Sequence, residues 1–258
     1  AAGGVGGRPL EVVVYDDQTD VERTKANVTN ALADPDVFAM IGIWSSTRGA
    51  AVVKEIGASG LPFISEMSVE TLFSPYANIY TLTRSVADEQ EVFKAFALER
   101  YRRIAFIGDG DDIYTRAYFE HVAQPGHELG LMPPVWIFGN IDDQRERIDA
   151  EIAAMKSSGA DLVFLSVGSK RGAAFLDRMT EAGLDLPVFL GLGSISGVLA
   201  DPSGAGRRYK GPLYEVAEGG IANLNNERLE QLMRRTEREG GGRRFAPYAT
   251  GYGARYAD

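Results

Sequence analysis

The chain has 258 residues, of which 45% are hydrophobic and 24% charged, a composition typical of a globular protein with one large or two ordinary domains. The net charge of −9 opposes binding to nucleic acid or to an anionic membrane surface. The chain has no cysteine, which excludes disulfides and thiolate-ligated metals, and its two histidines, His121 and His127, argue against a catalytic triad or a His-rich metal site.

Short apolar runs alternate with amphipathic stretches, which predicts alternating strands and helices. The expected strands are Leu10–Tyr15, Val37–Ile43, Pro62–Ser65, Ile79–Leu82, Arg103–Ile107, Val135–Phe138, Asp161–Ser166, Pro187–Gly191 and Gly211–Val216. Several are almost continuously apolar, as in parallel strands buried on both faces. A helix is expected from Val86 to about Arg102, and residues at helical spacing predict two more: Ile148, Ile152, Met155, and Leu229, Leu232, Met233.

An internal repeat refines this prediction. The segment Ser46–Ala51 (STRGAA) recurs as Ser169–Ala174 (SKRGAA), and nine residues beyond each copy stands a glycine, Gly60 or Gly183. Two copies of one strand–helix–strand unit indicate two lobes of the same fold. The alternative is convergence, because serine is a common helix cap and alanine a common helix former.

We therefore expect an α/β protein with two Rossmann-like, doubly wound parallel-sheet lobes joined by a hinge. Lobe one would comprise residues 1–84 and 217–258, and lobe two residues 85–216. No run of about 18 apolar residues occurs, so no membrane insertion is expected, and the glycine-rich start lacks the features of a signal peptide.

Candidate binding residues follow the predicted strands, at the edge where parallel sheets bind ligands. After Val37–Ile43 come Trp44, Ser45 and Ser46, with Ser46 as a helix cap and an anion donor, or as a cap alone. Trp44 is either core or a stacking platform. After the next strand come Met67 and Ser68, where Ser68 is expected to cap another helix.

In lobe two, Asp109, Asp111 and Asp112 follow a strand and precede Tyr114. Three acids near a turn can bind Mg²⁺ or Ca²⁺, but the oxygen spacing of a calcium loop is missing, and we favour a turn with a helix cap and no metal. Gly168 and Gly193 follow later strands and are expected to line the opposite wall.

These segments resemble type I periplasmic solute-binding proteins of ABC transporters, the branched-chain amino-acid and amide-binding group related to the Leu/Ile/Val-binding protein. The similar segments are Gly3–Gln18, Ile41–Ser46 (IGIWSS), Gly60–Ser65 (GLPFIS), Asp111–Tyr114, Ser158–Phe164 and Glu181–Leu184. The family's opening strand and helix and its last strands have no counterpart, so the chain looks like an internal piece with the first strand missing.

The resemblance implies a periplasmic or extracellular protein without catalytic residues or cofactor, which closes on a small molecule and delivers it to a membrane permease. Family members that bind amino acids hold the ammonium group through an aromatic hydroxyl and an acid, and the matching positions here are Gly168 and Gly193. We therefore expect a carboxylate ligand that is aromatic or otherwise not an α-amino acid.

Two alternatives remain open at this point. A ligand-sensing receptor domain can have the same fold. A dinucleotide-dependent enzyme is suggested by Gly191–Gly197 after a strand, with Glu215 about 20 residues on, although the following helix would be very short.

Overall fold

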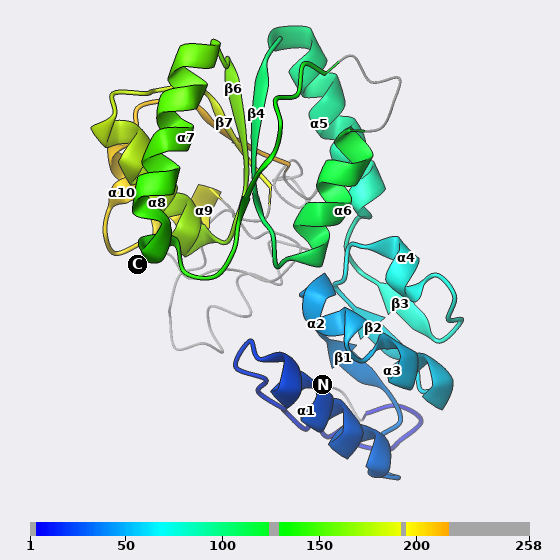
Figure 1. Cartoon of the computed structure of the whole chain (residues 1–258). Coiled ribbons are helices and arrows are strands. Elements are labelled where there is room, and N and C mark those ends of the chain that lie inside the picture. Colours follow the sequence, from blue (N-terminus) through cyan, green and yellow to red (C-terminus); the bar gives the residue numbers. More distant parts are fainter. Residues whose placement is uncertain (1–3, 124–128, 192–194, 217–258) are drawn as a thin grey trace.

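The computed structural model describes residues 4–123, 129–191 and 195–216. This part of the chain contains two separate parallel sheets (Figure 1). We call residues 4–84, which contain the first sheet, the first unit, and the described residues from 85 to 216, which contain the second sheet, the second unit. The elements of the first unit are α1 (Val21–Ala33), β1 (Met40–Gly42), α2 (Ser46–Ala50), α3 (Val53–Ser59), β2 (Phe63–Ser65), α4 (Glu70–Phe73) and β3 (Ile79–Thr81).

The second unit is larger and contains a five-stranded parallel sheet in the order β5-β4-β6-β7-β8. Its elements are α5 (Val86–Arg100), β4 (Ile104–Asp109), α6 (Ile113–Val122), β5 (Val135–Ile137), a 3₁₀ helix (Ile141–Gln144), α7 (Arg145–Ser158), β6 (Leu162–Ser166), α8 (Ser169–Glu181), β7 (Val188–Leu190), α9 (Ile195–Leu199), α10 (Ala205–Arg208) and β8 (Leu213–Glu215). This order is the doubly wound arrangement that was expected.

Helices cover both faces of the second sheet (Figure 1). Along β6, Leu162 and Phe164 belong to the core beneath α5 and α6, whereas Val163 and Leu165 belong to the core beneath α7 and α8. Successive side chains of a strand point to opposite faces, so a strand covered on both sides must be apolar throughout. The continuous apolar run in the sequence therefore predicted this strand correctly.

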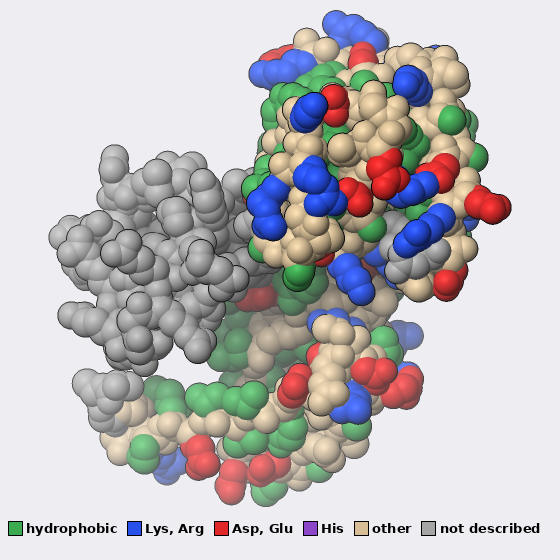
Figure 2. Space-filling view, turned by 90° about the vertical axis from the view of Figure 1, so that its left-hand side faces the viewer, with side chains coloured by type: hydrophobic (Ala, Val, Ile, Leu, Met, Phe, Trp, Pro, Cys, Tyr) green, Lys and Arg blue, Asp and Glu red, His purple; other side chains and the backbone are tan. Residues whose placement is uncertain are grey.

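The first sheet has the order β1-β2-β3 and a smaller core, in which Val28, Ile56, Phe63 and Ile79 are buried. The other face of this sheet carries Ile41 and Tyr80, which are 79% and 57% exposed. Figure 2 shows hydrophobic side chains gathered on the surface of the lower, first unit.

The predicted strand Leu10–Tyr15 is wrong. No strand is assigned to this segment and none pairs with it in the described part of the chain, and Val12 and Val14 stay 83% and 82% exposed. The strand expected at Val37–Ile43 begins only at Met40, where its backbone first pairs with β2. The later strands begin and end within two residues of their predicted bounds.

The expected helices that fall within the described residues are present in the structure. The helix from Val86 ends at Arg100, and Ile148, Ile152 and Met155 are the buried residues of α7. Leu229, Leu232 and Met233 lie outside the described residues, as does the part of lobe one assigned to residues 217–258, which stays a prediction. No helix in the described ranges is long and apolar enough to cross a bilayer.

Both copies of the repeat lie between adjacent parallel strands. The first copy lies between β1 and β2, and the second lies between β6 and β7. Gly60 and Gly183 both have a positive φ, 71° and 62°, at the turn that follows the helical segment. Only glycine adopts this conformation at little cost, so the conserved spacing to a glycine reflects the same turn in both units.

Candidate functional site

The order of the second sheet reverses between β4 and β6. From β4 the chain goes to β5 on one side, whereas β6, β7 and β8 follow one another on the other side. Ligands of such sheets bind in the crevice at the carboxyl ends of the strands where the order reverses. In this chain those ends lead into the acidic loop after β4 and into Gly168 after β6.

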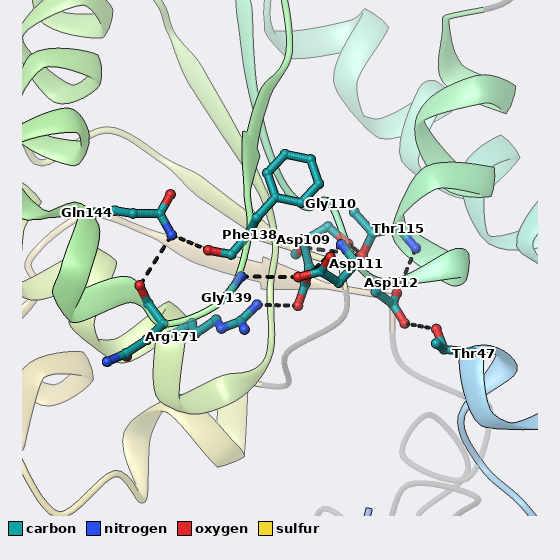
Figure 3. A network of polar contacts seen from close by, with 12 residues as sticks. Thr47, Asp109, Gly110, Asp111, Asp112, Thr115, Phe138, Gly139, Gln144 and Arg171 are labelled. Carbon is teal, nitrogen blue, oxygen red and sulfur yellow. Dashed lines mark hydrogen bonds and ion pairs between the residues drawn. The ribbon is translucent and has the colours of Figure 1, made fainter. Parts of the chain in front are cut away.

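Each carboxylate of the acidic loop is engaged by the protein (Figure 3). Asp109 accepts a hydrogen bond from Arg171 Nη1 at 2.5 Å, and Asp111 accepts one from the backbone N–H of Gly139 at 3.1 Å. Asp112 Oδ2 accepts from Thr115 N at 2.8 Å and caps α6. The interpretation of this loop as a turn and a helix cap is confirmed. No group of three potential metal ligands is found among the described residues.

The carboxyl group of Asp109, at the end of β4, is largely buried, with 14% of its side chain exposed. Burial raises the pKa of its carboxyl group, and this effect outweighs the hydrogen bond from Asp111 N and the positive charge of Arg171, which lower it. Arg171 belongs to the second copy of the repeat, on α8. The pair therefore fixes the start of α8 against the end of β4, next to Gly168.

The chain turns sharply where β1 ends. Ile43 has a φ of 57°, a left-handed conformation that is rare for a β-branched residue, and it precedes Trp44, which is 48% exposed. Such backbone strain tends to occur at functional sites. Ser45 then caps α2, and its Oγ accepts from Arg48 N at 3.3 Å.

The predicted caps at Ser46 and Ser68 are wrong, because each helix begins one residue away from its expected position. Ser46 is the first residue of α2, and its buried Oγ accepts from Ser68 N at 3.3 Å and from Val69 N at 3.4 Å. The N-cap of α4 is Val69. Ser46 thus holds the loop after β2 against α2, with Met67 fully buried beneath it.

The remaining predicted site residues lie in the second unit. Tyr114, in the first turn of α6, donates its hydroxyl to Glu89 Oε2 on α5 at 2.5 Å and is partly buried. Gly168 is the N-cap of α8, and a Cβ added there would meet no atom within 4 Å, so this position borders open space. Gly193 lies outside the described residues.

Thr47 joins the rims of the two units, a contact that no pattern in the sequence indicated. Its hydroxyl donates to Asp112 Oδ1 at 2.8 Å and accepts from Ile113 N at 2.9 Å (Figure 3). The loops that follow β1 and β4 are thereby brought together. Trp44 and Ser45 stand two to three residues before Thr47, and Tyr114 stands two residues after Asp112, so these candidates lie beside one junction.

Glu215, the acid of the dinucleotide alternative, has a structural partner. Its Oε2 accepts from the backbone N–H of Ile195 at 2.7 Å, at the start of α9. This helix has only five residues, as the sequence indicated, which leaves little of the long helix that a dinucleotide-binding turn requires. A groove between α7 and α8 is lined by Lys170, Asp177 and Arg178 and belongs to the outer helical layer.

Comparisons with known proteins agree with the fold. A family model described as "Periplasmic binding protein" matches residues 1–255, whereas no curated protein matches the chain. The structure resembles a leucine-binding protein of Thermotoga maritima, with a TM-score of 0.78 and 14% identity over 95% of this chain and 69% of that one.

Two further solved structures contain ligands. A branched-chain amino-acid binding protein of Streptococcus pneumoniae, in complex with isoleucine, has a TM-score of 0.78 and 17% identity over 93% of this chain and 68% of that one. A solute-binding protein of an ABC transporter from Rhodopseudomonas palustris, in complex with 3,4-dihydroxybenzoic acid, has a TM-score of 0.70 and 17% identity over 95% of this chain and 67% of that one.

Proposed function

The chain belongs to the periplasmic binding protein family, and from this premise we propose that it is an extracytoplasmic solute-binding protein of an ABC transporter. It takes up one small molecule between its two units, closes around it by hinge motion and delivers it to the membrane permease. It performs no catalysis. The observation that carries this proposal is the junction at Thr47 and Asp112, where the rims of both parallel sheets meet.

We place the ligand against Trp44 and Ser45 on the first unit and against Tyr114 and Gly168 on the second. Trp44 is exposed at the rim and can stack on a flat group. Ser46, Met67 and Ser68 lie behind this surface and support it through the hydrogen bonds of Ser46.

The proposed ligand is a carboxylate that is aromatic or otherwise lacks an α-amino group. Gly168 has no side chain to hold an ammonium group. The relative from Rhodopseudomonas palustris in complex with 3,4-dihydroxybenzoic acid supports an aromatic acid, whereas the relative in complex with isoleucine represents the competing ligand class.

Calorimetric titration with benzoate, 3,4-dihydroxybenzoate, leucine and isoleucine tests this function. We expect an aromatic carboxylate to bind, and the branched-chain amino acids not to bind. Trp44→Ala should weaken binding about tenfold or more, because the stacking surface is lost. Tyr80→Ala is the matched control, since Tyr80 is a similarly exposed aromatic residue in the middle of β3, away from the rim.

Two results would overturn these assignments. Preferential binding of leucine or isoleucine would refute the ligand class. Equal affinities of Trp44→Ala and Tyr80→Ala for the bound compound would show that the site lies elsewhere.

A further inference from the structure

We propose that Thr47 and Asp112 form a latch that sets the equilibrium between an open and a closed arrangement of the two units. Thr47 lies on α2 of the first unit, and Asp112 is the N-cap of α6 in the second unit. The two residues are 65 positions apart in the sequence, so their contact arises only from the way the units meet.

The hydroxyl group of Thr47 acts both as a hydrogen-bond donor and as an acceptor in the latch. Thr47 Oγ1 donates to Asp112 Oδ1 at 2.8 Å and accepts from Ile113 N at 2.9 Å. The other oxygen of Asp112 accepts from Thr115 N at 2.8 Å. One carboxylate therefore caps a helix and holds the opposite unit at the same time (Figure 3). The bond to Thr47 can break without uncapping α6, because a separate oxygen makes each bond.

A second set of contacts between the units differs in kind. Where the chain crosses from one unit to the other, Val86 N donates to Ser68 O at 2.8 Å, and Val69 packs in the core beneath α5. These contacts adjoin the connecting segment at residues 82–85, so they can persist while the units rotate about it. The latch consists of two polar side-chain bonds near this crossing, since Thr47 follows Ser46, whose Oγ accepts from Ser68 N. Water can replace these two bonds when the units separate.

The position of the latch connects it to binding. Thr47 follows Trp44 and Ser45 on one wall, and Asp112 precedes Tyr114 on the other. Closing the latch brings both walls together, so a ligand held between them binds best in the latched state. This coupling to affinity rests on the proposed function, whereas the latch itself does not.

Thr47→Val is the decisive variant, because valine keeps the shape of threonine and has no hydroxyl. Thr47→Ser is its matched control, because it keeps the hydroxyl. The chain has no cysteine, so two introduced cysteines carry spin labels at unique sites. Lys54→Cys on α3 and Ala153→Cys on α7 place the labels on exposed positions in different units.

Distances between the labels are measured by pulsed electron paramagnetic resonance without ligand. We expect Thr47→Val to raise the ratio of open to closed molecules roughly 5- to 30-fold, since one to two net hydrogen bonds are lost. Thr47→Ser should match the parent. Identical distance distributions for the valine and serine variants, with both proteins folded, would overturn the latch.

A binding measurement separates this proposal from the proposed function. If a ligand of the expected class binds, Thr47→Val should weaken its apparent affinity by the factor by which the closed population falls. If no compound binds but the distances shift as expected, the latch stands and the ligand assignment fails. If a compound of the expected class binds but the distances do not shift, the ligand assignment stands and the latch fails.

Discussion

The two arginines of the repeat make equivalent contacts in the two units. Arg48 Nε lies 3.0 Å from Asp17 Oδ2, and Arg171 Nη1 lies 2.5 Å from Asp109 Oδ2. The carboxyl groups respond in opposite ways. Burial raises the pKa of Asp17, but hydrogen bonds from Thr19 and Thr24 and the charge of Arg48 outweigh it, so the pKa is lowered overall. At Asp109 burial prevails, and the pKa is raised.

These directions predict how Asp17 contributes to stability at different pH values. A carboxyl group with a lowered pKa in the folded state stabilises the protein above its ordinary pKa, and this stabilisation is lost as the pH falls through the lowered value. Asp17→Asn should therefore reduce the free energy of unfolding by about 1 kcal/mol at pH 7. The difference from the parent should shrink as the pH is lowered below 3.8, the ordinary value for aspartate.

Urea denaturation at pH 7, 5 and 3 measures this effect. Asp16→Asn is the control, because Asp16 accepts a similar bond from the backbone N–H of Gln18 but makes no ion pair with Arg48. If Asp17→Asn has the same deficit at pH 3 as at pH 7, the charge of Asp17 is not the source of its contribution.

At the scale of elements, the repeat predicted a strand–helix–strand unit in each half of the chain, but not the difference between the helices of the two copies. In the first copy the helix is interrupted, so that α2 and α3 are separate, whereas the second copy is the single helix α8. Gly49 and Gly172 occupy the same place in the two copies. A Cβ on Gly49 would lie 2.0 Å from Met67 Sδ, whereas a Cβ on Gly172 would come no closer than 3.4 Å to Val198.

The same substitution should therefore have opposite effects in the two copies. Gly49→Ala should destabilise the protein by roughly 1–3 kcal/mol, because Met67 is fully buried and cannot move aside without repacking. Gly172→Ala should be neutral or stabilise by up to about 1 kcal/mol, because alanine favours the helix interior. Thermal unfolding of both variants measures these effects, and each variant is the control for the other. Equal effects would show that the close approach of Met67 does not matter.

The contrast between Leu162–Ser166 and Leu10–Tyr15 explains how far the sequence could predict the fold. Both segments are apolar runs, and an apolar run indicates only that a segment is suited to a buried strand. Of the two segments, β6 alone pairs with a strand on each side. The candidate site stays a prediction, but the positions of its residues in the fold can be compared with the expectation. Trp44 and Tyr114 follow strands as expected, whereas the N-cap of α2 is Ser45 and not Ser46, one residue from the predicted position. No sequence pattern could pair Thr47 with Asp112, because topology alone brings them together.

At the scale of the whole molecule, the two units have unequal cores. The second unit buries its sheet between two helical layers, and all five residues of β6 are buried. In the first unit Ile41 and Tyr80 leave one face of the sheet exposed. Buried apolar area is the main source of stability, so the first unit is expected to open at a lower free energy than the second.

Native-state hydrogen exchange monitored by mass spectrometry tests this difference. Amides of β4, β6 and β7 should exchange slowest, and amides of β1, β2 and β3 should exchange faster through opening of the first unit alone. A ligand that contacts both units would stabilise the first unit by RT ln(1 + [L]/Kd), about 2.7 kcal/mol at a hundredfold excess over Kd, and would slow exchange in β1–β3. Thr47→Val should leave β6 unchanged, because its contact lies outside the second core. Equal protection of β2 and β6 in the free protein would mean that the two units unfold together, and the junction would then be a fixed interface.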